Sequence, residues 1–276
     1  DGIAMGHKGM RYSLISRDVI SDCCEVMVEG HALDGWVGVS NCDKVTPGML
    51  IAMGTMNVPG LIVTGGAMEV GKDGDKSLDL QSVFEAVGAY SAGKVDGDYL
   101  KKIECSACPG RGSCSGLFTA NTMACLTETL GLSLTGCATA LADDNRKLSI
   151  ARETGRRIVE LVKKDIKPRD IISRESFRNA IRVDMAIGGS TNTALHLPAI
   201  SKAFGCPVTL DDFDEISRVT PHITSLRPGG PFSIKDLDLA GGIPAVLSIL
   251  KDMLDDVPTA NGKTIKEIAS KGKVCN

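Results

Sequence analysis

The stretch WVGVSNCDKVTP (residues 36–47) decides the fold of this chain. Its first four residues, Trp36 to Val39, form an apolar, β-branched run that is bounded by turn-forming residues, which is typical of a buried strand. Thr46 and Pro47 are typical of an N-cap and of the first residue of a helix, so we expect a helix to begin there. Cys42, Asp43 and Lys44 would then occupy a tight turn at the carboxyl end of the strand, where open α/β sheets bind their ligands.

The chain continues with the same alternation. Met49 to Met53 is an apolar stretch suited to the expected helix, and Leu61-Ile62-Val63 predicts a second buried strand. Alternating helices and strands favour a mostly parallel sheet that is covered by helices on both faces. We therefore predict an α/β fold, a three-layer α/β/α domain that extends over residues 1–276.

Helical periodicity extends over much of the remaining sequence. From Ser16 to Gly30 the apolar positions recur at helical spacing, and we expect the adjacent Cys23 and Cys24 to pack in the core. Residues 66–79 are rich in Gly, Asp and Lys and are expected to form a mobile surface loop. Further helices are expected at about 82–92, 99–103, 117–131, 143–165, 173–188, 193–197, 209–219, 242–254 and from 264. In the helix at 143–165 the side chains expected to face inward are Leu148, Ile150, Ala151, Ile158, Val159 and Val162.

Composition excludes several classes of function. The 276 residues are 43% hydrophobic and 24% charged, which is typical of a globular protein. A net charge of -3 gives no electrostatic reason to expect nucleic acid or an anionic membrane as partner. No apolar run approaches the roughly 20 residues of a membrane span, and no signal peptide is evident. We therefore expect a cytoplasmic protein, or an organellar one if the source is eukaryotic.

Ten cysteines are many for such a chain. In a long chain without a secretory signal, reduced thiols are favoured over a disulfide framework. The densest group is CSACPGRGSC (residues 105–114), in which small residues would let the backbone wrap around a metal. Cys114 precedes a predicted helix, whose amino terminus favours a thiolate. Cys105 and Cys108 have zinc-knuckle spacing, but no second CxxC accompanies them. Cys125, Cys137 and Cys206 are isolated and are expected to serve in packing.

Two glycine-rich segments are candidates for binding anions. Residues 66–73 (GAMEVGKD) nearly match a phosphate-binding loop, but Asp73 stands where Ser or Thr should bind Mg²⁺, so we interpret the match as false. Ser190, Thr191 and Asn192 follow Gly188-Gly189 at a predicted helix amino terminus, a possible cradle for a carboxylate or phosphate. A plain helix cap is an equally good interpretation of that segment. His196 is expected to be packed, which leaves His7 as the one histidine worth testing.

Taken together, five segments resemble the dihydroxy-acid dehydratases of the IlvD/Edd family of iron–sulfur dehydratases. They are DGIAMGH (1–7), SNCDKVTPGM (40–49), GGAME (65–69), GSCSGLFTANTM (112–123) and GGSTNT (188–193). The resemblance extends along the whole chain. It implies an amino-terminal domain that is truncated at its start and lacks the family's carboxyl-terminal domain.

The resemblance also implies a set of site residues. Cys42 and Cys114 match two of the three cysteines that hold the iron–sulfur cluster. Asp1 and Asp43 match carboxylate ligands of Mg²⁺, and Lys44 matches a lysine that is carbamylated to serve as a further ligand. The remaining cysteine, a glutamate ligand and the catalytic serine base of the family lie outside this chain. No catalytic base is therefore expected within it.

The implied reaction removes water from a small 2,3-dihydroxy acid to give a 2-keto acid, a precursor of branched-chain amino acids. Soft thiolates suit iron and hard oxygens suit Mg²⁺, so the turn at residues 42–44 would serve both metals. The cluster type, [2Fe–2S] or [4Fe–4S], stays open, and a homodimer is expected by resemblance. The alternatives are a 6-phosphogluconate or sugar-acid dehydratase, or a structural-zinc or nucleotide-binding module.

Overall fold

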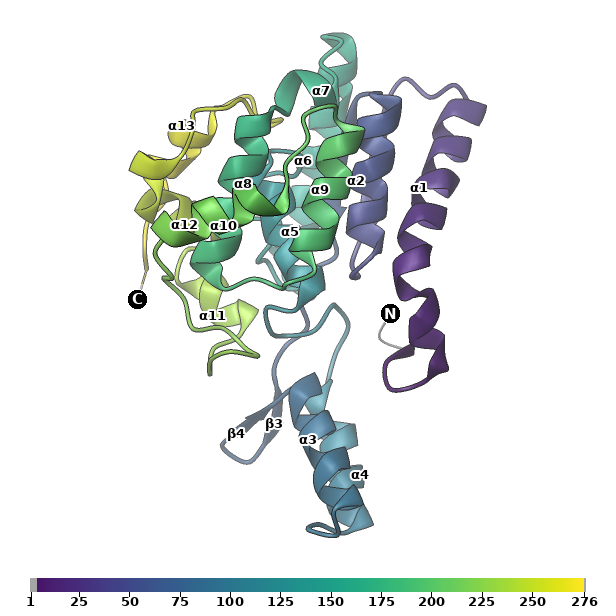
Figure 1. Ribbon diagram of the computed structural model, residues 1–276, viewed down its shortest axis with the longest axis vertical. Coiled ribbons are helices and arrows are strands. Elements are labelled where there is room, and N and C mark those ends of the chain that lie inside the picture. Colours follow the sequence, from purple (N-terminus) through teal and green to yellow (C-terminus); the bar gives the residue numbers. More distant parts are fainter. Residues whose placement is uncertain (1–3, 276) are drawn as a thin grey trace.

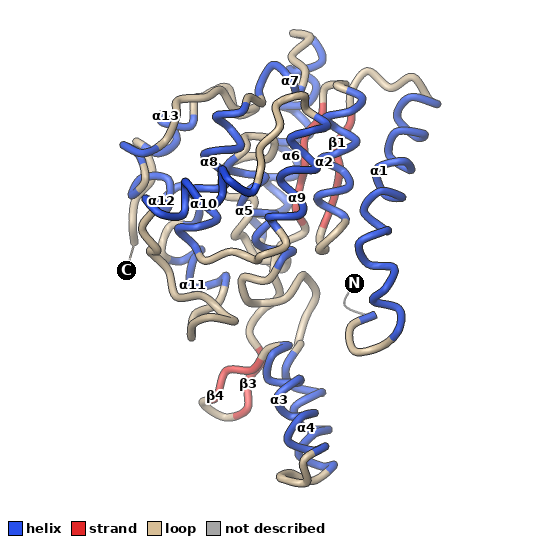
Figure 2. Tube along the Cα trace, in the orientation of Figure 1, coloured by secondary structure: helices blue, strands red, loops and turns tan. Residues whose placement is uncertain are grey.

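The computed structural model describes residues 4–275. Its central sheet consists of β1 (Trp36–Ser40) and β2 (Gly60–Thr64), which pair in parallel with Trp36 opposite Gly60 and Ser40 opposite Thr64. The connecting helix α2 (Val45–Met56) and the later helix α6 (Asn145–Lys163) both pack against this strand pair (Figures 1 and 2). The α/β class and the parallel pairing are confirmed, although the parallel sheet within the described residues has two strands.

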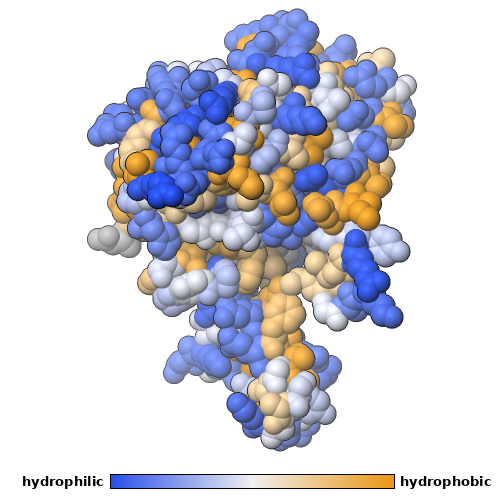
Figure 3. Space-filling view, in the orientation of Figure 1, coloured by the Kyte–Doolittle hydropathy of each residue, from blue (hydrophilic) through white to orange (hydrophobic). Residues whose placement is uncertain are grey.

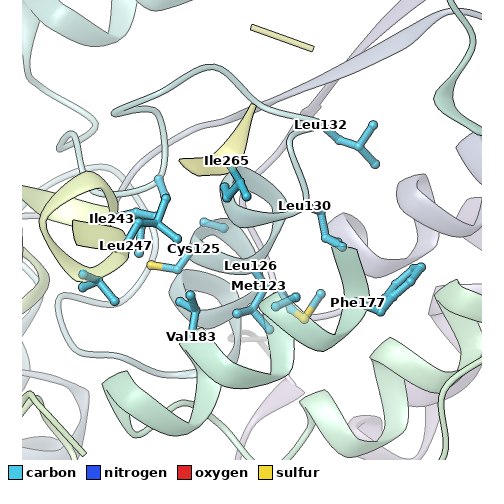
Figure 4. Close-up of a cluster of buried hydrophobic side chains, with 14 of the residues drawn as sticks. Met123, Cys125, Leu126, Leu130, Leu132, Phe177, Val183, Ile243, Leu247 and Ile265 are labelled. Carbon is cyan, nitrogen blue, oxygen red and sulfur yellow. The ribbon is translucent and has the colours of Figure 1, made fainter. Parts of the chain in front are cut away.

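Most of the core is helical. Helix α5 (Thr119–Thr129) lies at its centre, and Figure 4 shows Met123, Cys125 and Leu126 of this helix among side chains from three other helices. Every side chain of α5 except Ala120 is buried. The helices around it are α7 (Pro168–Ile171), α8 (Arg174–Ile187), α9 (Thr193–Ala203), α10 (Leu210–Val219), α11 (Ile234–Leu239), α12 (Gly242–Ile249), η3 (Lys251–Met253) and α13 (Ile265–Ala269).

Local sequence explains several of these helix starts. Ser173, Thr209 and Thr264 accept or exchange hydrogen bonds with the third residue of their helices, as capping boxes do. In α6 the expected inward positions are wrong at Leu148, Ala151 and Val159, whose side chains are exposed, whereas Ile150, Ile158 and Val162 are half-buried. Helix α6 contacts the sheet along one narrow face, so only part of its apolar set is covered.

A separate arm extends from the core (Figure 1). It consists of the antiparallel hairpin β3 (Gly71–Asp73) and β4 (Lys76–Leu78) and of the helices α3 (Leu80–Ser91) and α4 (Gly97–Ala107). The expected surface loop at 66–79 is therefore wrong in part, because eight of its residues, Gly71 to Leu78, make up this hairpin. The arm has a small core of its own, formed by Leu78, Ala86, Ile103 and Ala107.

The chain begins with η2 (Lys8–Tyr12) and α1 (Ser13–Gly30), which lies along α2. The expectation that Cys23 and Cys24 pack in the core is wrong, because Cys23 is exposed and Cys24 is half-buried. A Cβ at Gly48 of α2 would lie 2.7 Å from the carbonyl oxygen of Arg17, so the two helices approach closely through small residues. The apolar residues of α1 are only partly covered: Val28 is buried, whereas Val26 is 70% exposed, and Figure 3 shows orange side chains over this helix.

Candidate functional site

The turn at residues 42–44 follows β1 directly. Cys42 and Asp43 are half-buried, whereas Lys44 is only 6% exposed and donates a hydrogen bond to Asp43 Oδ2 at 3.5 Å. Lys44 is the N-cap of α2, so the predicted cap at Thr46 is wrong. The hydroxyl of Thr46 lies 2.8 Å from that of Ser40 and is engaged there, which leaves it unavailable for capping.

The segment that carries Cys114 continues the carboxyl edge of the sheet. Ser113 forms a parallel bridge with Ala67, and its N–H donates to the carbonyl oxygen of Gly66 at 2.9 Å. A Cβ at Gly112 would lie 2.6 Å from the backbone nitrogen of Met68, and its φ of +125° is in the region that favours glycine. Glycine at position 112 therefore lets the loop approach the end of β2.

The side chain of Asn121 in α5 fixes the conformation of this loop through hydrogen bonds. Its amide donates to the carbonyl oxygens of Cys114 and Gly116, and its oxygen accepts from the hydroxyl of Ser113 at 2.7 Å. Asn121 is 2% exposed, so these contacts fix the backbone on both sides of Cys114. The loop conformation is thus determined by the core helix that follows it.

The structure brings Cys42, Asp43 and Cys114 close enough for their charges to act on one another. The pKa of the Cys114 thiol is raised to about 11, first by burial, then by the negative charges of Cys108 and Asp43, and to a smaller extent by Cys42. Without a cation, such surroundings oppose the thiolate. A bound metal cation would reverse the balance, because it stabilises coordinated thiolates.

The third predicted segment, residues 190–192, lies beside the first turn of α5. The hydroxyl of Ser190 lies 2.8 Å from that of Thr119, and the amide of Asn192 donates to Thr119 Oγ1 at 2.9 Å. The backbone N–H of Ser190 donates to Thr122 Oγ1 at 3.1 Å, and Thr191 is exposed. The cysteine loop and the 190–192 segment are therefore joined through α5.

Three helix amino termini meet at this end of the core. Helices α2, α5 and α9 begin here at Val45, Thr119 and Thr193, and they pack against one another. At the opposite end, Arg169 bonds to Asn57 after α2 and to Ala203 at the end of α9. The partial positive charges of three helix amino termini favour anions at this end of the core, although for the Cys114 thiolate burial and the neighbouring negative charges outweigh that effect.

Two groups near Lys44, Arg17 and His196, were not predicted as part of the site. Arg17 on α1 lies behind the turn, with Nη1 at 3.4 Å from Nδ1 of His196 on α9. His196 is fully buried, as expected, and its pKa is lowered to about 3 by burial and by the charges of Lys44 and Arg17. Neither residue belongs to a recognisable motif, since only tertiary packing brings α1 and α9 to the same end of α2.

A buried carboxyl group lies beneath the 190–192 segment. Asp184 on α8 is 1% exposed, and its Oδ2 accepts from Thr193 Oγ1 at 2.6 Å. Burial raises the pKa of Asp184 to about 7. This residue also accepts from the N–H of Gly189 through its backbone carbonyl, at 3.0 Å, and so fixes the glycine pair.

Two further predicted residues, Asp1 and His7, lie near the start of the chain. Asp1 lies outside the described residues. His7 is exposed and accepts from the N–H of Gly9 at 2.9 Å.

A cavity of about 400 Å³ opens beside the turn, lined by Asn41, Gly65, Arg111, Gly112, Ala142, Asp143, Asp144, Asn145 and Leu148.

Metal-binding alternatives can be compared on the described part of the chain. Within residues 4–275 no three His, Cys, Asp or Glu side chains are grouped as a metal would require, which holds for Cys105 and Cys108 as it does for Cys42 and Cys114. Both Cys105 and Cys108 are exposed on the arm. The nucleotide-binding alternative is not supported, because a phosphate-binding loop is followed by a helix, whereas residues 71–73 form the first strand of a β-hairpin.

No helix of the described chain combines the length and the apolar character needed to cross a membrane.

Comparison with known proteins identifies relatives along the whole chain. Residues 1–268 match the dihydroxy-acid/6-phosphogluconate dehydratase N-terminal family. The chain is 56% identical over its full length to dihydroxy-acid dehydratase 1 of Methanosarcina acetivorans and to the dihydroxy-acid dehydratase of Methanosarcina barkeri. It is 55% identical, over 99% of its length, to the dihydroxy-acid dehydratase of Methanococcus aeolicus. In each case the chain spans 50% of the relative's length. The chain therefore belongs to the dihydroxy-acid/6-phosphogluconate dehydratase family and represents its N-terminal domain.

Proposed function

We propose that the full-length protein containing this chain dehydrates 2,3-dihydroxy carboxylic acids to 2-keto acids. The observation that carries the proposal is the 52–56% identity, over nearly the whole chain, to proteins named dihydroxy-acid dehydratase. The clustering of Cys42, Asp43 and Cys114 at one edge of the core is consistent with it.

The donor set suits two metal sites. Cys42 and Cys114 would hold an iron–sulfur cluster, and Asp1, Asp43 and Lys44 would hold Mg²⁺, since soft sulfur ligands suit iron and oxygen ligands suit Mg²⁺. Burial and the neighbouring negative charges raise the pKa of the Cys114 thiol, so its thiolate would form at neutral pH only with a bound cation beside it. When bound, these metals would supply the Lewis acidity that makes the C3 hydroxyl a leaving group and the C2 proton acidic.

Lys44 can serve a cation only after it loses its own positive charge. Carbamylation would give its side chain a carboxylate with two oxygen donors, beside the carboxylate of Asp43. The site has a low exposed fraction at Lys44, which limits hydrolytic access to such a group. We therefore include a carbamylated Lys44 in the proposed magnesium site.

The role proposed for Ser190, Thr191 and Asn192 is to bind the substrate carboxylate. They lie at the amino terminus of α9, where N–H groups and hydroxyls favour an anion. Ser190 and Asn192 are held by Thr119, so their polar groups are preorganised before substrate arrives. No residue of this chain is proposed as the catalytic base.

The remaining expectations concern the whole protein. We propose a cytoplasmic homodimer (or an organellar one in a eukaryote) that acts on a small dihydroxy acid and binds neither nucleic acid nor membrane. A 6-phosphogluconate or sugar-acid dehydratase is the second candidate, because the matching family includes 6-phosphogluconate dehydratases. The chain by itself is expected to be inactive, and appreciable turnover of 2,3-dihydroxyisovalerate by residues 1–276 alone would contradict this.

The deciding experiment is a substrate comparison on the full-length protein after anaerobic reconstitution with iron, sulfide and Mg²⁺. We expect 2-keto acid formation from 2,3-dihydroxyisovalerate and much slower turnover of 6-phosphogluconate. The reverse preference would transfer the assignment to the second candidate. Stoichiometric zinc without iron, or tight nucleotide binding, would instead favour a module of another class.

A further inference from the structure

The imidazole of His196 has a defined tautomer. Nη1 of Arg17 lies 3.4 Å from Nδ1 of His196 and 3.4 Å from the carbonyl oxygen of Leu195. A guanidinium group offers only donors, so Nδ1 must accept this hydrogen bond. The neutral ring then carries its hydrogen on Nε2, which is the nitrogen on the far side from Arg17.

That Nε2–H group has no described hydrogen-bond partner. His196 is fully buried, and within residues 4–275 no acceptor lies within bonding distance of Nε2. A buried donor that lacks an acceptor is costly, and native proteins rarely leave one unsatisfied. The position therefore requires an acceptor that the unmodified residues 4–275 do not provide.

Lys44 is the neighbouring group whose chemistry can supply one. It is 6% exposed and is the N-cap of α2, which packs against α9, the helix that carries His196. Its charge also acts on His196 together with that of Arg17. The side-chain ends of Arg17 and Lys44 are both donors, as is Nε2–H of His196, so the three groups contain no acceptor for each other beyond Nδ1. Carbamylation of Lys44 would replace an ammonium donor with two carboxylate oxygens and would change the sign of its charge.

We propose that His196 is a positioning residue for Lys44: its Nε2–H donates to an oxygen of the Lys44 carbamate, and Arg17 fixes the required tautomer through Nδ1. This inference rests on the proposed function, of which the carbamate is a part. In the modification, the lone pair of the unprotonated Nζ forms an N–C bond with CO₂. One C=O π pair moves to oxygen, and Nζ releases a proton to solvent, so that an amine and CO₂ give a carbamate and H⁺.

The test measures the carbamate itself. The full-length protein is equilibrated with ¹³C-bicarbonate, and the carbamate resonance that Lys44→Ala abolishes is followed by ¹³C NMR as dissolved CO₂ is varied. His196→Leu should require about tenfold to a hundredfold more CO₂ for half occupancy, the effect of one lost hydrogen bond to a charged group. His196→Gln retains an N–H donor and should remain much closer to the native protein.

Arg17→Met provides an independent variant, because it removes the donor to Nδ1 and should also weaken carbamylation while leaving His196 in place. If His196→Leu fails to fold, Arg17→Met tests the inference in its place. A CO₂ dependence equal to that of the native protein in both His196→Leu and Arg17→Met would overturn the inference alone and would point to a buried water as the acceptor. Absence of any Lys44-dependent resonance in the native protein would overturn the carbamate as well, whereas dehydratase activity is tested separately.

Discussion

The hydroxyl groups of Ser40 and Thr46 lie 2.8 Å apart, and both side chains are buried. Ser40 ends β1 and Thr46 is in the first turn of α2, so this hydrogen bond closes the turn that carries Cys42, Asp43 and Lys44. The turn is thus held at both ends before any metal binds.

Thr46→Val should destabilise the chain by about 1–3 kcal/mol, because the isosteric change leaves the buried Ser40 hydroxyl without its partner. Adding Ser40→Ala should recover much of that loss, since both polar groups are then absent. Urea unfolding of the two single variants and the double variant forms the required cycle. Strictly additive losses would show that the two hydroxyls do not depend on each other.

The fold around this turn was predictable because its signals are local. A β-branched run ending in polar residues predicts a strand, and both β1 and β2 are found where the sequence places them. The start of α2 was not predictable, because the choice of Thr46 between capping its own helix and bonding to Ser40 depends on tertiary contact. The hairpin at 71–78 was missed because its strands are three residues long and carry polar side chains.

The motifs of the site could be predicted from the sequence, whereas the residues that position those motifs could not. The resemblance named Cys42, Asp43, Lys44 and Cys114, and their assignment as metal ligands stays a prediction. Arg17 and His196 could not be anticipated, since they are 179 residues apart and meet only through packing on α2. The exposure of several apolar side chains of α1 could not be predicted either, because periodicity defines an apolar face without saying whether another element covers it.

The stability of the chain should fall with rising pH through the titration of Asp184. An unfolded Asp ionises near pH 3.9, whereas burial raises the pKa of Asp184 in the folded state to about 7. Folding therefore takes up a proton in this window, and the contribution of Asp184 to stability is lost as pH rises through it. Asp184→Asn should flatten this fall, by on the order of a few kcal/mol between about pH 4 and about pH 7.

The measurement is the free energy of unfolding by urea of the native protein and of Asp184→Asn between about pH 4 and about pH 7. Asp212→Asn is a suitable contrast: burial alone would raise the pKa of Asp212, but bonds from Thr209 and Arg174 lower it overall. Its contribution should therefore have the opposite sign: it is present above about pH 4 and is lost as pH falls below that value. Asp212→Asn should consequently leave the shape of the profile between about pH 4 and about pH 7 unchanged. A pH profile of Asp184→Asn that runs parallel to the native one would contradict the proposed burial effect.

Asn192→Ala should raise the KM for the dihydroxy acid about tenfold in the full-length protein, with a smaller effect on kcat. The reason is that Asn192 bonds to Thr119 and Ser190 and so orders the amino terminus of α9. Asn261→Ala is the matched control, because Asn261 bonds to residues 133 and 135 beyond the other end of α5. Equal KM changes in the two variants would argue against a binding role for the 190–192 segment.

We propose that Cys42 and Cys114 hold one iron–sulfur cluster between them. The most direct measurement is the iron and acid-labile sulfide content of the full-length Cys42→Ser and Cys114→Ser variants after anaerobic reconstitution, with Cys105→Ser on the exposed arm as control. We expect at least about tenfold less iron and sulfide in each of the first two variants and a native content in the control. Native iron and sulfide in either Cys42→Ser or Cys114→Ser would contradict it.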